Sequence, residues 1–303
     1  MHVTILGSAA GGGFPQWNCW CPTCRVGRAD PARAHARTQS SVAVSADTRR
    51  WFLLNASPDV HAQIARLPSA RANEVRYVPV EGIALTDAEL DHTLGIALLR
   101  EAGALHLYAT SSVLGVLDHD SRVLPVTRAF ACVDVTILEL DGLPAPLRYQ
   151  DGSTSGLSIQ AVEVAGDPPR FASEFVPGHT VALVVHDGAT GGTCAFVPGC
   201  GALDAALLAR LATADLVVLD GTFFTDDELQ RHGIGQRTAM QMGHLPIGGP
   251  NGTLAAFAGL PCRHKVYSHI NNTNLVLLED SLERQAVERA GILVGRDGME
   301  FQI

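Results

Sequence analysis

The sequence predicts an α/β (α+β) fold in which two mixed sheets pack face to face and helices cover their outer sides. Three features of the 303-residue chain support this prediction. Short apolar, often β-branched runs bounded by Gly, Pro or Asp recur along the chain, as in strands. These runs come in pairs at first and later alternate with helical periodicity. Polar or acidic residues directly follow several of them. This order favours an αββα sandwich over a doubly wound sheet.

The individual elements follow from the same patterns. Strands are expected at residues 3–6, 41–45, 51–55, 83–85, 105–108, 157–164, 181–185, 193–197, 216–219 and 265–268. Helices are expected at residues 59–67, 93–101, 203–212, 253–260 and 280–290. Because no repeat and no long Pro/Gly/Ser-rich linker interrupts the chain, we expect one domain over residues 1–303.

Composition narrows the class of protein. The net charge is −9, and the richest arginine stretch, residues 25–37, also contains Asp30. A nucleic-acid partner is therefore not expected, since such proteins usually carry a basic patch. No apolar run approaches the roughly 20 residues of a membrane span, and the first residues lack the pattern of a signal peptide. We expect a cytoplasmic protein without a membrane partner.

Three of the seven cysteines, Cys19, Cys21 and Cys24, cluster in a loop near residues 18–24. An odd count with a tight cluster indicates metal binding rather than disulfides. The CxCxxC spacing predicts a structural Zn²⁺ site, with a fourth ligand from elsewhere. The alternative is three cysteines of the core, but polar and proline neighbours favour a loop.

A glycine-rich loop at residues 7–13 follows the first strand. It lacks a P-loop Lys-Ser/Thr and no helix follows it, so a nucleotide site is weakly indicated. Close approach of the backbone to another group is the favoured interpretation.

Carboxylates and a histidine follow the strand at 83–85. Asp87, Glu89 and Asp91 alternate, and an extended loop would point them the same way, with His92 directly after them. These are ligands for a divalent metal. The alternative is a helix cap with solvated neighbours.

Two further strands end in candidate ligands, Asp220 and His269. An acid at a strand end lies where α/β proteins present functional groups, although Asp220-Gly221 could also form a turn. The polar run after His269 is richer in hydrogen-bonding groups than a plain turn, although it could be a hydrogen-bonded loop.

These motifs resemble the metallo-β-lactamase superfamily, which carries HxHxDH after a core strand. Asp87 and Glu89 stand where the first two histidines would be, and Asp91 and His92 match the remainder. Asp220 falls at the position of the bridging aspartate.

The resemblance also places the later ligands. His269 falls at the final-histidine position, and His179 is a candidate for the intermediate histidine or a plain surface histidine. The CxCxxC insert marks a subclass with phosphonate-pathway phosphodiesterases and the family of pyrroloquinoline quinone (PQQ) biosynthesis protein B. The segments that look like the latter family are residues 6–19, 55–59, 197–200, 220–222, 242–244 and 269–274.

The resemblance implies a role in PQQ biosynthesis. It implies an Fe(II)- and O₂-dependent hydroxylation of the tyrosine ring in the crosslinked Glu–Tyr derived from the precursor peptide, or alternatively a carrier of PQQ or its precursor. A metal-dependent hydrolase, such as a phosphodiesterase, is a further alternative. Other PQQ biosynthesis proteins are the expected partners, together with a second copy of the chain in a homodimer.

The resemblance also implies which residues act. Asp91, His92, Asp220 and His269 are the expected catalytic metal ligands, with Asp87 and Glu89 in reserve. Two histidines with carboxylates match the facial triad of non-haem Fe(II), but Zn²⁺, Mn²⁺ or Cu²⁺ could also bind. Related subclass members supply a zinc-binding histidine three residues after the final active-site histidine. Here Asn272 stands there, so the fourth zinc ligand stays open.

Overall fold

The chain folds into two seven-stranded sheets in the computed structural model, which describes residues 1–68 and 75–303. The first sheet has the order β14 (Met299–Gln302), β1 (His2–Gly7), β2 (Ser41–Ser45), β3 (Trp51–Leu54), β4 (Val80–Ala84), β5 (Ala104–Ala109) and β6 (Cys132–Ile137). The second has the order β13 (Leu293–Val294), β12 (His264–Ser268), β11 (Leu216–Asp220), β10 (Thr193–Val197), β9 (Val181–Asp187), β8 (Thr154–Glu163) and β7 (Ala145–Arg148). Both sheets are mixed, as predicted.

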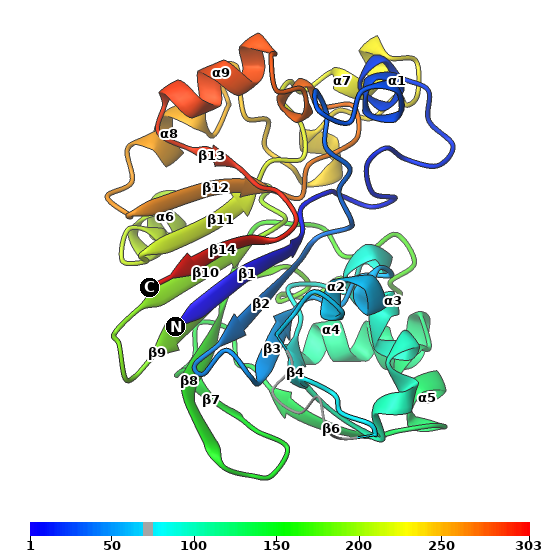
Figure 1. The fold of residues 1–303 in the computed structure, drawn as a ribbon, viewed down its shortest axis with the longest axis vertical. Coiled ribbons are helices and arrows are strands. Elements are labelled where there is room, and N and C mark those ends of the chain that lie inside the picture. The colour runs from blue at the N-terminus through cyan, green and yellow to red at the C-terminus, as the bar shows by residue number, and fades with distance from the viewer. Residues whose placement is uncertain (69–74) are drawn as a thin grey trace.

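Helices cover the outer face of each sheet (Figure 1). The first sheet carries α2 (Val60–Ile64), α3 (Leu90–Leu98), α4 (Ser111–Gly115), the π-helix η2 (Val116–Asp120) and α5 (Val123–Arg128). The second carries α6 (Ala205–Leu211), α8 (Leu254–Ala258) and α9 (Leu282–Arg289). The remaining helical segments are α1 (Pro22–Ala29), α7 (Glu228–Arg231) and the 3₁₀ turns η1 (Arg100–Ala102), η3 (Met240–Met242) and η4 (Leu275–Leu277). The predicted αββα sandwich is therefore observed.

Strand β11 shows why the layers form. All five of its residues are buried. Leu216 and Val218 pack between the two sheets, whereas Val217 and Leu219 pack toward the outer helices. Because successive side chains of a strand point to opposite faces, a strand covered on both sides must be apolar throughout.

The carboxyl ends of parallel strands from both sheets meet at one edge. In the first sheet β3, β4 and β5 run parallel, and in the second β10, β11 and β12 do. A backbone hydrogen bond of 2.8 Å from Val181 to the carbonyl of Thr86 joins the sheets there. Asp87 follows β4, Asp220 ends β11 and His269 follows β12. His269 has φ of 56°, an uncommon value for a residue with a side chain.

The expected extended loop through Asp91 is wrong. Helix α3 begins at Leu90 rather than at 93, so Asp91 and His92 lie in its first turn, after Glu89 in extended conformation. The helix places an acid near its positive end, which is a favourable position.

The bounds of other elements also differ from those predicted. The four other expected helices are shorter than predicted because their end residues adopt turns or irregular structure. The strands that the pattern missed, β6, β7, β13 and β14, include the edge strands of both sheets, which are short or partly exposed. Among the helices within residues 1–68 and 75–303, none has the length and apolar character that crossing a bilayer requires.

Candidate metal centres

Two groups of metal-binding side chains lie side by side at the shared strand edge. Asp91, His92 and His269 form one group, and Asp220, His244 and His269 form the other, each with ligand atoms within 4.8 Å of one another. The ring centroids of His92 and His269 are 5.1 Å apart, and those of His244 and His269 are 5.4 Å apart. His269 belongs to both groups.

The carboxylate of Asp87 fixes the orientation of His92. Both of its oxygens lie 2.8 Å from Nδ1 of His92, so this nitrogen carries the proton. The same oxygens accept from the Thr86 hydroxyl at 2.7 Å and from the Glu89 amide at 2.9 Å. When the ring loses its second proton, as on binding a metal, Nε2 of His92 is the nitrogen that presents a lone pair. It is buried without a hydrogen-bond partner among the described residues, 3.9 Å from the Asp91 carboxylate. A bound metal ion would satisfy this nitrogen.

A second network fixes His269. The Thr222 hydroxyl lies 2.6 Å from Asp220 Oδ1, which can only accept, and 2.8 Å from His269 Nδ1. The hydroxyl therefore donates to Asp220 and accepts from Nδ1–H of His269. Nε2 of His269 then faces the Asp91 carboxylate at 3.4 Å.

Asp220 also holds His244, whose Nδ1 lies 2.7 Å from Oδ2. The backbone amides of Cys200 and Thr222 donate to the same carboxylate, each at 3.0 Å. Asp220 thus has four hydrogen-bond donors around its two oxygens, whereas Asp91 faces two imidazole nitrogens.

The electrostatics of the first group favour positive charge. Burial disfavours the charged imidazole of His92, but Asp87 and Asp91 outweigh it and raise the pKa to about 9. Burial likewise opposes ionisation of Asp91, yet His92 and His269 hold its pKa well below the usual range. A divalent cation would meet the same demand for positive charge, so the donor set fits a metal ion.

These residues open into a cavity of about 740 Å³. Asp87, Glu89, Asp91, His92 and His269 all line it, and Glu89 is exposed there. Neither Asp87 nor Glu89 belongs to either three-residue group. The glycine-rich loop forms one wall, where a Cβ on Gly11 would lie 3.2 Å from Asp91 Oδ2. Close backbone approach, as the sequence indicated, is what this loop provides.

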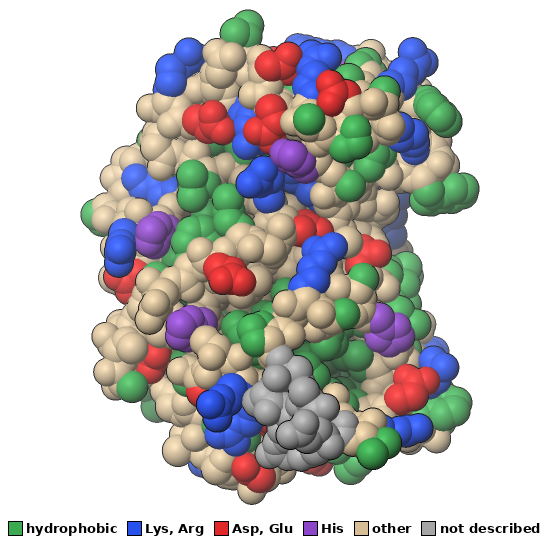
Figure 2. Space-filling model, viewed as in Figure 1, with side chains coloured by type: hydrophobic (Ala, Val, Ile, Leu, Met, Phe, Trp, Pro, Cys, Tyr) green, Lys and Arg blue, Asp and Glu red, His purple; other side chains and the backbone are tan. Residues whose placement is uncertain are grey.

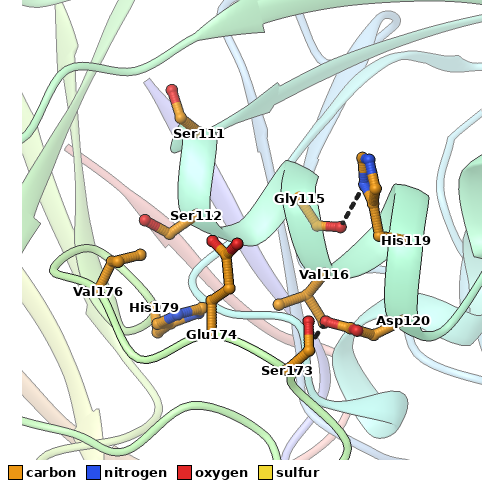
Figure 3. Close-up of a pocket in the computed structure, with 10 residues that line it drawn as sticks. All are labelled: Ser111, Ser112, Gly115, Val116, His119, Asp120, Ser173, Glu174, Val176 and His179. Atoms are coloured by element: carbon orange, nitrogen blue, oxygen red, sulfur yellow. Dashed lines mark hydrogen bonds between the residues drawn. The ribbon is translucent and has the colours of Figure 1, made fainter.

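His179 lies in a different cavity of about 310 Å³ (Figure 3). It comes from the same loop as Glu174 and faces the side of α4 and η2 that carries Ser112 and Val116. Both of its ring nitrogens are buried without a hydrogen-bond partner among the described residues. The structure does not bring it together with His92 and His269.

The three clustered cysteines form a separate centre. Their sulfurs lie within 4.8 Å of one another, and no fourth His, Cys, Asp or Glu of the described chain joins them. The Asn272 amide lies on their open side, with Nδ2 3.1, 3.6 and 3.3 Å from the sulfurs of Cys19, Cys21 and Cys24. A hydrogen bond from Cys24 lowers the pKa of Cys21 against the effect of burial, so a thiolate forms there first. Thiolates are the form that binds zinc.

Sequence reasoning did not assign roles to His244 and Thr222. His244 stood in the segment at residues 242–244 that carried part of the resemblance, which was the available signal. It follows the turn η3 rather than a strand, so the strand-end rule could not find it. Thr222 follows Asp220 by two residues, a spacing that also fits a plain turn.

The chain is similar to known proteins in both sequence and structure. The model of the β-lactamase superfamily domain matches residues 50–270. The chain is 44% identical to a coenzyme PQQ synthesis protein B from Gluconacetobacter diazotrophicus, over 99% of each chain. It is 41% identical to a protein of the same name from Pseudomonas putida, over the full length of both.

Solved structures agree with these relatives. The crystal structure of Zn²⁺-bound PqqB from Methylobacterium extorquens superimposes with a TM-score of 0.89 at 37% identity, over all of both chains. A diphosphatase from the PhnP family gives a TM-score of 0.68 at 18% identity, covering 100% of this chain and 97% of that one. The second likeness concerns the fold alone.

Proposed function

Because the chain belongs to the coenzyme PQQ synthesis protein B family and has the metallo-β-lactamase fold, we propose that it is an Fe(II)- and O₂-dependent hydroxylase of PQQ biosynthesis. Its substrate is the crosslinked Glu–Tyr derived from the precursor peptide, and the tyrosine ring is hydroxylated. The observation that carries this proposal is the set Asp91, His92 and His269, which are two imidazoles and one carboxylate facing an open cavity. Such a set is typical of non-haem Fe(II) oxygenases.

Asp91, His92 and His269 would hold the metal. When bound, Fe(II) would supply the redox chemistry that lets O₂ react with an aromatic ring. Imidazole nitrogens with a carboxylate also accept Zn²⁺, Mn²⁺ or Cu²⁺, so the native metal is part of the proposal.

The surrounding residues act by positioning. Asp87 keeps the proton of His92 on Nδ1, and Thr222, bonded to Asp220, does the same for His269. Each interaction leaves Nε2 free to bind. Partners of this kind orient metal ligands and raise their basicity. We therefore propose that Asp220 acts through Thr222 and His244, and that Glu89 contacts substrate or water from the cavity wall.

The reaction has a defined balance. One atom of O₂ replaces a ring hydrogen as a hydroxyl group, and the other leaves as water. Two electrons and two protons come from an external reductant, such as ascorbate in an assay.

The test is anaerobic reconstitution with Fe(II), followed by exposure to O₂ and ascorbate with the crosslinked Glu–Tyr. Mass spectrometry should find the substrate with one or more added oxygens. Protein reconstituted with Zn²⁺ is the control and should give no such product. An unchanged substrate with the iron-loaded protein would contradict the proposal.

A hydrolase is a second candidate because the two groups around His269 place potential metal sites side by side. Two metals about 3.5–4 Å apart are a feature of hydrolases such as phosphatases and nucleases.

Several features argue against a hydrolase. Carboxylates replace the first two histidines of the motif. Furthermore, Asp220 already has four donors around its carboxylate. On the face seen in Figure 2, basic side chains are interspersed with acidic ones rather than gathered in a stripe, which does not favour an RNA substrate. Phosphodiester cleavage by the zinc-loaded protein would favour the hydrolase.

Three further assignments belong to this proposal. Cys19, Cys21 and Cys24 hold a structural Zn²⁺, with Asn272 or water at the fourth position. The protein works in the cytoplasm, where clustered thiols stay reduced. It also forms a homodimer, for which the exposed Trp17 and Trp20 beside the thiols are candidate contacts. A carrier role would be indicated if the precursor bound tightly but was never oxidised.

A further inference from the structure

Two arginines that line the metal cavity form no ion pair with the residues that the structure describes. Arg170 and Arg237 both line it, both are exposed, and neither forms an ion pair with any residue in the described part of the chain. An unpaired guanidinium on a cavity wall presents a planar fork of donors that matches a carboxylate.

Arg170 belongs to the connection between β8 and β9, residues 164–180, which has no helix or strand. Connections longer than about 12–15 residues are uncommon and are usually functional. Hydrogen bonds anchor this one at several points: Ser173 donates to Asp120 at 3.1 Å, Ser112 to Pro177 at 2.5 Å, and Thr110 to Gly178 at 2.6 Å. The Arg170 guanidinium lies near enough to Glu89 to interact with it electrostatically, but it forms no hydrogen bond with a described residue and so keeps its donors for a ligand.

Arg237 reaches the cavity from the segment between α7 and η3. One guanidinium nitrogen donates to the carbonyl of Gln241, which limits the positions that the side chain can take. The amides of Ala239 and Met240 donate to Asp226 at 2.8 and 2.9 Å and hold the backbone. The remaining donors of the guanidinium are available.

Aromatic side chains and acids complete the walls. Phe175, on the same loop as Arg170, is 78% exposed and lines the cavity, and Phe223 lies beneath His244 with ring centroids 6.2 Å apart. A large exposed aromatic ring beside a cavity suits stacking on a ring of the ligand. Glu89 and Asp167 line the same cavity and would receive ammonium groups.

We propose that Arg170 and Arg237 are the residues that bind the carboxylates of the substrate, that Glu89 and Asp167 bind its ammonium groups, and that Phe175 stacks on its ring. This inference rests on the proposed function and assigns the residues that hold its substrate.

The test measures binding without turnover. The iron-loaded protein is titrated calorimetrically, without O₂, with the crosslinked Glu–Tyr and with the same compound whose carboxylates are converted to amides. Arg170→Gln and Arg237→Gln should each weaken binding of the acid about tenfold, the loss of one charge-assisted hydrogen bond, and leave binding of the amide unchanged. Arg170→Lys should have an intermediate effect, because it keeps the charge and loses the fork.

The matched control is Arg263→Gln, an exposed arginine before the amino end of β12 and therefore at the opposite sheet edge from His269. It should bind both compounds as the wild type does. Equal affinity of the acid in wild type and the double variant, or equal weakening of acid and amide, would overturn the inference. Carboxylate-dependent binding without oxidation would instead contradict only the proposed hydroxylation, and oxidation that ignores both arginines would contradict only this inference.

Discussion

The cysteine centre and the histidine–aspartate centre lie at the two ends of one short loop. His269 opens this loop in the cavity, and three residues later Asn272 reaches the sulfurs of Cys19, Cys21 and Cys24. The sulfur centre is capped by an amide. The other centre faces a cavity of about 740 Å³ and leaves Nε2 of His92 without a partner in the described chain.

The difference between the two centres is one of ligand chemistry and access. Soft thiolates that surround an ion leave no position for a substrate, as in structural zinc sites. Hard oxygen and imidazole ligands beside a cavity leave positions open, as in sites that perform chemistry. Under the proposed function, a single loop joins a structural site to a reactive one, and changes at the two centres should have different consequences.

The largest effect is expected from His92→Ala or His269→Ala. Each change removes one of the imidazoles of the Asp91 group. Because loss of an outer partner alone costs about 10–100-fold in metal affinity or activity, we expect these variants to lose the cavity metal and activity by more than 100-fold. Metal content and the rate of product formation measure these two losses. His264→Ala, on the same strand β12 at its far end, is the control and should keep both. Retained metal in His269→Ala would contradict the assignment.

Cys21→Ser should affect stability and zinc content more than chemistry. Losing one thiolate removes a ligand whose ionisation the neighbouring cysteines favour. We expect loss of zinc and a lower melting temperature, while folded molecules keep their cavity metal. Cys132→Ser, at an exposed cysteine outside the cluster, should leave zinc content unchanged. A Cys21→Ser protein with full zinc content and normal melting would show that the thiols do not form a metal site.

Asp87→Asn should show how much the orientation of the His92 ring contributes, apart from direct binding of the metal. The carboxylate holds Nδ1–H of His92 and is not itself in either group. We expect a decrease of about 10–100-fold in activity or metal affinity, smaller than for His92→Ala. Complete loss of metal in Asp87→Asn, with retention in His269→Ala, would reverse the proposed order of ligands.

Asn272→His should strengthen the sulfur centre. Asn272 already lies within 3.6 Å of all three sulfurs, and imidazole is a better zinc ligand than an amide. Tighter zinc binding, measured by competition with a chelator, is expected, with activity changed less than about twofold. Unchanged zinc affinity would mean that the fourth ligand comes from elsewhere.

The smallest effect is expected at Glu228, which supports the connecting loop. Its carboxylate accepts from the Thr273 hydroxyl at 2.8 Å, and burial raises its pKa to about 7 despite hydrogen bonds that oppose the shift. Since the folded state then holds a proton that the unfolded state has lost, stability should fall as pH rises from about 4.5 to 7. Glu228→Gln should remove this fall in stability and raise the free energy of unfolding by about 1–2 kcal/mol at pH 8. Denaturation at several pH values measures it, and parallel curves for both proteins would contradict it.

The sequence predicted what depends on local pattern. Apolar runs such as β11 and the acid that ends it were evident, and the clustered cysteines pointed to a metal through their spacing alone. The start of α3 was not evident from the sequence, because Leu90 and Asp91 fit a loop or a first helical turn equally well. Only the fold could show that His244 meets Asp220, since that contact joins segments without a common motif. Likewise, only the fold could show that His179 lines a different cavity from the other histidines.

The most direct test of the central claim is the origin of the oxygen in the product. The iron-loaded protein is given the crosslinked Glu–Tyr and ascorbate under isotopically labelled O₂ in ordinary water, and then under ordinary O₂ in labelled water. Hydroxylation at the Asp91, His92 and His269 centre predicts label in the tyrosine ring only from O₂, and no product with His269→Ala. Label that enters from water, or an oxidised product from His269→Ala at the wild-type rate, would contradict the account.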